Sequence, residues 1–126
     1  MDIRKKQKAV VAALEDIKAR DVAAFNVTHL TSLFDRVIIA TAESARQTKA
    51  LSVHLQERMK ALGERVQGVE GESGGEWVLV DLGDVVVHIM QPAIRQYYNL
   101  EELWDQPAPR GRRPRAKPKP AEEAAA

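Results

Sequence analysis

Two valine-rich segments separated by a short turn constrain the fold of this chain more than any other feature. They are residues 77–81 (WVLVD) and residues 84–90 (DVVVHIM), and Leu82-Gly83 stands between them. β-Branched residues favour strands, and a two-residue connection that contains glycine is typical of a β-hairpin. Because both segments are almost continuously apolar, we expect helices to cover both faces of the sheet that contains them.

Apolar residues recur at helical spacing in two stretches before the hairpin. One stretch predicts an amphipathic helix that ends near Arg20, and its apolar positions are Val10, Leu14 and Ile17. The other predicts a helix whose apolar stripe consists of Leu51, Leu55, Met59 and Leu62. Ser44 and Gln47 have the spacing of a capping box that would begin this second helix, and Gly63 would end it in a left-handed conformation.

The remaining segments complete the predicted order of elements. Strands are expected at residues 24–28, 35–41 and 65–70, and the β-branched run of 35–41 indicates burial on both faces. Pro92 can begin a short last helix. The residues expected to fasten the end of the folded part to its body are Leu100, Leu103 and Trp104. The order α-β-β-α-β-β-β-α predicts an α/β fold, a mixed β-sheet of about five strands flanked by helices.

The formal net charge of +1 is unevenly divided along the chain. Residues 1–104 carry 13 Lys and Arg against 15 Asp and Glu, which gives −2, whereas residues 105–126 carry 6 against 3, which gives +3. The first range is predicted to be one folded domain, and the second a disordered tail rich in Pro, Arg and Lys. A solubilising role is favoured for this tail, and a phosphate-binding arm for RNA is the alternative.

The composition limits the chemistry and the surroundings of the protein. There is no cysteine, which excludes disulfides, zinc–thiolate sites and thiol nucleophiles. No phosphate-binding glycine motif occurs, and a hydrogen-bonded structural role is favoured for the three histidines, which are His29, His54 and His88. No cofactor or metal is expected. Without a secretory signal or an apolar run of about 18 residues, the chain is expected to be cytoplasmic, with no membrane partner.

Asp81 and Asp84 are the pair of residues most typical of an enzyme. Two carboxylates beside a strand turn could hold magnesium for phosphoryl transfer. They flank a tight turn, however, rather than alternate on one strand face, and no third carboxylate is aligned with them. A turn-capping or partner-binding role is therefore favoured, and a magnesium-dependent nucleotidyltransferase-type enzyme is the alternative.

Trp77 borders an acidic stretch of the chain, and two interpretations of it stay open. As a core residue it would cover one end of the sheet. As an exposed anchor it would lie at the centre of an interface, where tryptophan is enriched. The carboxylates around it suit a basic protein partner better than RNA, and they are Glu70, Glu72, Glu76, Asp81 and Asp84.

Several separated motifs resemble the ribosomal silencing factor family, whose members are also known as iojap-related proteins. The motifs are GVEGE at 68–72, EWVLVDLGDVVVHIM at 76–90, DRVIIAT at 35–41 followed by Ser44, and YNLEELW at 98–104. The resemblance covers about residues 3–104. It implies a nucleotidyltransferase-like α/β fold that lacks the catalytic residues, so the chain is not expected to be an enzyme.

The resemblance also implies a partner and a mechanism. Members of the family bind ribosomal protein uL14 of the large subunit at an inter-subunit bridge, which prevents the small subunit from joining and represses translation when nutrients are short. By position, the surface that faces this partner would comprise Glu70, Trp77, Asp81, Leu82, Asp84 and Met90. Trp77 and Leu82 are its strongest candidates. A homodimer of the free protein and a weak contact of the basic tail with ribosomal RNA are compatible with this function.

Overall fold

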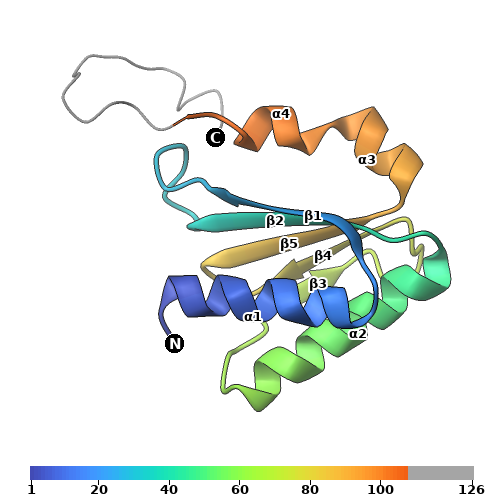
Figure 1. Ribbon diagram of the computed structural model, residues 1–126, viewed down its shortest axis with the longest axis horizontal. Coiled ribbons are helices and arrows are strands. Elements are labelled where there is room, and N and C mark those ends of the chain that lie inside the picture. The colour runs from blue at the N-terminus through green and yellow to red at the C-terminus, as the bar shows by residue number, and fades with distance from the viewer. Residues whose placement is uncertain (108–126) are drawn as a thin grey trace.

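A five-stranded sheet is the central layer of the computed structural model, which describes residues 1–107 (Figure 1). The elements follow as α1 (Ile3–Asp16), β1 (Arg20–Asn26), β2 (Arg36–Thr41), α2 (Ala45–Ala61), β3 (Gly68–Glu70), β4 (Trp77–Asp81), β5 (Val85–Met90), α3 (Pro92–Tyr98) and α4 (Leu100–Trp104). The strands lie in the order β1-β2-β5-β4-β3. β2 and β5 are parallel, whereas the other neighbouring strands are antiparallel. The predicted mixed sheet flanked by helices is thus confirmed.

The two layers of helices lie on opposite faces of this sheet. α1 and α2 pack below it in the view of Figure 1, while α3 and α4 lie above it. No helix within residues 1–107 is both long enough and apolar enough to cross a membrane. Most of the predicted disordered tail, residues 108–126, lies outside the described residues.

The β-hairpin and β2 carry most of the core. Along β5 the side chains alternate, so that Val85, Val87 and Ile89 face α1 and α2 while Met90 faces the other side. Every residue of β2 except Arg36 is buried, which confirms the two-sided burial predicted for this strand. Each fully buried aliphatic side chain contributes about 1.5–3 kcal/mol to folding.

The first helix ends, and the first strand begins, earlier in the chain than the sequence predicts. α1 ends at Asp16, because Lys18 adopts a left-handed φ of 65° and the Ala19 N–H donates to the Leu14 carbonyl. β1 therefore begins at Arg20 rather than at residue 24. Its residues are exposed or half-buried, so this edge strand lacks the strong apolar pattern of the central strands.

The predicted signals of α2 are present with small displacements. The Ser44 hydroxyl accepts a hydrogen bond from the Gln47 N–H at 3.1 Å, but the Gln47 side chain accepts from the Glu43 N–H rather than from that of Ser44. Gly63 has a φ of 84° and follows the helix as expected. The predicted apolar stripe is buried up to Met59, whereas Leu62 is 42% exposed.

A buried lysine joins α1 to the turn between β4 and β5. Nζ of Lys6 lies 2.6 Å from the Asp84 carboxylate and 3.1 Å from that of Glu64, and it donates to the Leu82 carbonyl at 2.8 Å. Burial alone would lower the pKa of Lys6, but the hydrogen bonds that Lys6 donates to Asp84 and Glu64, and the charges of these carboxylates, outweigh it, so the pKa is raised. These contacts fix the turn against the helix.

We expect Lys6→Met to lower the free energy of unfolding by about 1–3 kcal/mol, because the Leu82 carbonyl and Asp84 would lose their buried donor. Lys5→Met is the matched control, since Lys5 is exposed, and it should change the stability by less than about 0.5 kcal/mol. Urea denaturation followed by tryptophan fluorescence measures both. Equal losses in the two variants would contradict the role assigned to Lys6.

Candidate functional site

The face of the sheet beneath α3 and α4 is covered only in part. Over β1, β2 and the end of β5, the helices and the loop before β2 close a second apolar cluster around Val37, Ile39 and Met90. β4 lies beyond this cover except at Trp77, which packs against the cluster. Because Val78 and Val80 point into the core on the other face, the side chains of Trp77, Leu79 and Asp81 point outward here and are only half-buried.

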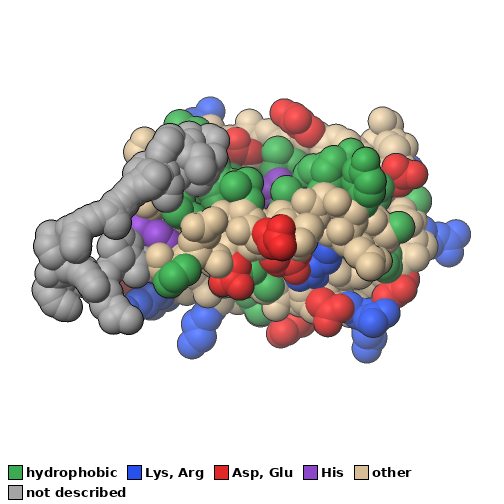
Figure 2. Space-filling view, turned by 90° about the horizontal axis from the view of Figure 1, so that it is seen from above, with side chains coloured by type: hydrophobic (Ala, Val, Ile, Leu, Met, Phe, Trp, Pro, Cys, Tyr) green, Lys and Arg blue, Asp and Glu red, His purple; other side chains and the backbone are tan. Residues whose placement is uncertain are grey.

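Two adjoining hollows lie along this uncovered strip. The larger has a volume of about 520 Å³ and is lined by Leu33, Phe34, Leu79, Asp81, Gly83, Val86, His88 and Trp104. The smaller has a volume of about 260 Å³ and is lined by Glu70, Gly71, Trp77, Leu79 and His88. Because both share Leu79 and His88, we treat them as one surface and call it the open-face groove. Figure 2 looks onto this side of the molecule, where hydrophobic side chains gather.

Trp77 is held in the groove by three neighbours. Its ring lies 4.8 Å from that of Tyr98, measured between centroids, and its indole N–H donates to Nδ1 of His88 at 3.0 Å. The chain at Gly71 passes so close to the Trp77 carbonyl that a Cβ there would collide with it, and the φ of 91° at Gly71 also favours glycine. Trp77 thus lies at the border between core and surface, since it packs against the second apolar cluster and also lines the groove.

His88 is a functional candidate that the sequence analysis missed. Burial lowers its pKa to about 4, so the imidazole is neutral near pH 7. A hydrogen-bonded structural role was predicted for all three histidines, and His29, His54 and His88 each make a hydrogen bond. His88 also lies on the floor of the groove. His88 lies two residues after Val86 and therefore on the same face of β5, and both residues line the larger hollow. This spacing is the sequence signal that could have placed His88 in the groove.

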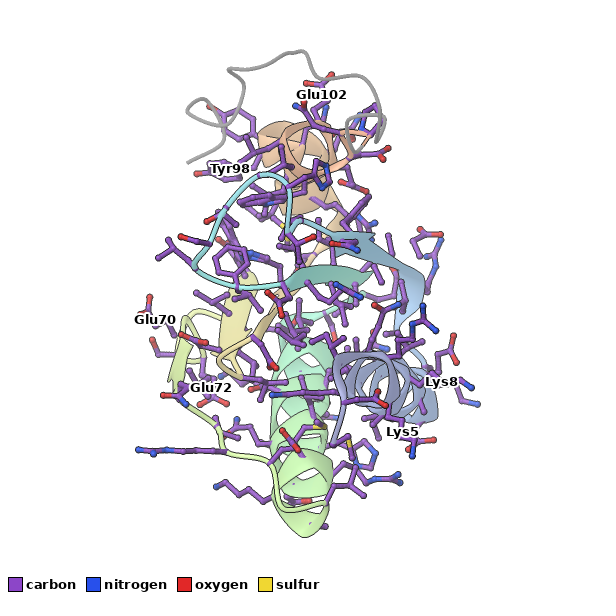
Figure 3. The ribbon with its side chains drawn as sticks, turned by 90° about the vertical axis from the view of Figure 1, so that its left-hand side faces the viewer. Lys5, Lys8, Glu70, Glu72, Tyr98 and Glu102 are labelled. Atoms are coloured by element: carbon purple, nitrogen blue, oxygen red, sulfur yellow. The ribbon has the colours of Figure 1, made fainter. Side chains whose placement is uncertain are left out.

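The groove lies in the acidic part of the protein. Residues 70–105 contain eight Asp or Glu and one Arg, a net charge of −7, and that arginine, Arg95, is paired with Glu101 at 2.7 Å. Figure 3 shows Glu70 at the β3 edge, on the same side of the molecule as Tyr98, whereas Lys5 and Lys8 lie on the opposite side. Glu72 is half-buried and accepts hydrogen bonds from Ser52 and Gln56 of α2. The surface around the groove is therefore negative.

Two of the six side chains predicted to face a partner lie inside the protein. Leu82 is 2% exposed and packs into the core against α1 and α2, and Met90 is fully buried in the second apolar cluster. We correct the predicted set accordingly, because a buried side chain offers no surface to a partner. Of the other four, Glu70, Trp77 and Asp81 line the groove, and Asp84 lies in the adjoining turn.

Both aspartates of the turn are engaged in the fold. Oδ1 of Asp81 accepts a hydrogen bond from the Gly83 N–H at 2.9 Å, which confirms the predicted turn-capping role. Asp84 binds Lys6. Within residues 1–107, no three His, Cys, Asp or Glu side chains are grouped so that they could hold a metal ion.

Comparisons with known proteins agree on one family. The model of the family described as "Ribosomal silencing factor during starvation" matches residues 1–126. A ribosomal silencing factor RsfS of Chromobacterium violaceum is 51% identical over 104 residues, which cover 82% of this chain and 85% of that protein. That of Bacillus subtilis is 37% identical over 77% of this chain and 82% of its own length. A crystal structure of a C. violaceum protein matches with a TM-score of 0.82 at 49% identity, covering 87% of this chain and 92% of that one.

We expect His88 to make the protein less stable in mild acid. The pKa of His88 is about 6.5 in the unfolded chain and about 4 in the folded protein, so the unfolded state binds more protons between these pH values. The free energy of unfolding should therefore fall by up to about 3 kcal/mol as the pH is lowered from about 6.5 to about 4. His88→Gln has no titrating group at this position and should lack this part of the loss. Urea denaturation at a series of pH values measures it, and identical pH profiles would contradict the prediction.

Proposed function

The chain belongs to the ribosomal silencing factor family, and on this premise we propose that it binds the large ribosomal subunit through ribosomal protein uL14. Bound there, it would block the inter-subunit bridge and prevent the small subunit from joining, which represses translation. The observation that carries this proposal is the open-face groove, which combines an apolar floor with an acidic rim. No catalytic step is part of it.

The floor of the groove supplies apolar surface for a partner. Trp77, Leu79 and Phe34 are half-buried, and Leu33 beside them is 78% exposed. Exposed apolar residues that gather in one place are typical of protein interfaces, and tryptophan is enriched among the residues that dominate binding energy. Trp77 is suited to this role because Tyr98 and His88 hold its ring in place before binding, which lowers the entropic cost of association.

The acidic rim selects the charge of the partner. Glu70 is exposed and Asp81 is half-buried, and both line the groove. A partner that covers these carboxylates has to supply a cation, because burying an unpaired charge is costly. Carboxylates around an apolar floor favour a basic protein segment, and they repel the phosphates of RNA. A basic ribosomal protein fits this surface better than ribosomal RNA does. The residues proposed to contact uL14 are therefore Glu70, Trp77, Asp81 and Asp84.

The proposed mechanism is steric exclusion. A domain of about 100 residues has a radius of gyration of about 13 Å, so it is roughly 30 Å across. An object of that size on the bridge surface keeps the two subunits apart without any chemical reaction. Rigidity matters for this function, and the Lys6 network and the two-sided core supply it.

Three lesser parts of the proposal follow from the same partner. The site of action is the cytoplasm, where the ribosomes are. The free protein would also form a homodimer when no ribosome is bound. The basic residues of 110–119 add a weak contact with ribosomal RNA; they lie outside the described residues.

We expect the purified protein to sediment with isolated large subunits in a sucrose gradient and to reduce the fraction of joined ribosomes when small subunits are added. Trp77→Ala should weaken binding by about 2–4 kcal/mol, the range of interface anchors, while circular dichroism shows an unchanged fold. Normal joining in the presence of saturating protein would defeat the proposal. Unfolding of Trp77→Ala would instead assign this residue to the core.

Reversing one charge on the rim tests the polarity of the interface. Glu70→Lys should weaken binding to large subunits about three- to tenfold at low ionic strength, and the loss should shrink as salt is added, because salt screens exposed charges. Glu57→Lys makes the same change at an exposed position of α2, on the far face of the sheet, and should bind normally. Surface plasmon resonance with immobilised subunits measures both variants. Equal affinities would exclude an acidic contact surface.

A further inference from the structure

His88 offers an unused hydrogen-bond donor on the floor of the open-face groove. Its ring lines both hollows, as does the side chain of Leu79. Nδ1 accepts the indole N–H of Trp77 at 3.0 Å. Within residues 1–107, Nε2 of this ring makes no hydrogen bond to another residue. One side of the imidazole is therefore fixed by the fold, and the other is free.

The contact with Trp77 determines where the single proton of the ring lies. An indole nitrogen can only donate, so Nδ1 of His88 must be the acceptor and cannot carry a proton. The ring is neutral near pH 7, because burial keeps its pKa at about 4. A neutral imidazole has one N–H, and here it must be at Nε2. The fold thus presents a donor at this position rather than an acceptor or a cation.

The structural role of His88, which is to accept the indole N–H of Trp77, uses only Nδ1. Nε2–H is a second polar group of the same ring, and a donor withdrawn from water costs about 1–3 kcal/mol when it has no partner. In the free protein, water in the groove can satisfy Nε2–H. A partner that displaces this water has to supply an acceptor in its place.

We propose that Nε2–H of His88 donates a hydrogen bond to a backbone carbonyl of the protein segment that occupies the open-face groove. This inference rests on the proposed function and extends the contact surface to a residue not included above. A carbonyl is the acceptor that fits, because Glu70 and Asp81 line the same hollows and disfavour a carboxylate. Trp77 then has a second role as a positioning residue, since its N–H holds His88 in the donating tautomer.

The tautomer is tested without the ribosome. Long-range ¹⁵N–¹H correlation NMR of the full chain at pH 7 distinguishes a protonated Nε2 from a protonated Nδ1. The expected result is Nε2–H for His88, and Trp77→Phe should shift the ring toward a mixture of the two tautomers. An Nδ1–H tautomer in the unchanged protein would overturn the inference.

Recognition is tested by binding to isolated large subunits. His88→Phe keeps a ring but removes the donor, and it should raise the Kd about tenfold. His88→Gln places an amide N–H near the position of Nε2 and should raise the Kd less than about threefold. His54→Phe is the matched control, because His54 lies on α2 and bonds to Asp16 on the far side of the sheet. It should bind normally. Thermal unfolding verifies the fold of each variant, and His88→Met replaces His88→Phe if the latter does not fold.

The possible results separate this inference from the proposed function. If the unchanged protein does not bind large subunits, the proposed function fails, and recognition by His88 fails with it. If the unchanged protein binds and folded His88→Phe binds equally well, only the inference about His88 is overturned. A tenfold loss in His88→Phe with recovery in His88→Gln supports the donor.

Discussion

The alternation of side chains along β4 and β5 determines both the stability of this protein and the surface that it offers. Val78, Val80 and Val87 fill the core against α1 and α2, while Leu79 and His88 point to the other face. Since the period of a strand is two, a slip of one residue in the pairing would exchange the two sets of side chains. The parallel partner β2 and the Lys6 contacts with the turn hold the register in place, so the groove is as fixed as the core beneath it.

The sequence predicts those features of the fold and the groove that depend on neighbouring residues. It does not predict the features that depend on contacts between distant parts of the chain. Local patterns predicted the hairpin, the buried β2 and the ends of α2, because neighbouring residues carry those signals. The early end of α1 was not predicted, since it depends on a left-handed Lys18. The burial of Leu82 and Met90 was also missed, because it depends on the packing of α1, α2 and α4 against the hairpin. Trp77 was left open for the same reason.

Positive and negative charges are concentrated in different parts of the sequence, although the net charge of the chain is only +1. Residues 1–69 carry twelve Lys or Arg and eight Asp or Glu, a net charge of +4, whereas residues 70–105 carry −7. In the fold, Glu70 and Glu72 are separated from Lys5 and Lys8 by the width of the sheet and its helices (Figure 3). The labelled acidic and basic residues therefore lie on different sides of the molecule.

The fold holds the polar groups of the groove in defined arrangements. Its carboxylates act as turn caps, ion-pair partners or exposed charges, and its histidine is kept neutral by burial, well below the pKa that a general base needs near pH 7. The Trp77–His88 hydrogen bond fixes the orientation and the tautomer of the imidazole, so this part of the groove presents one defined donor.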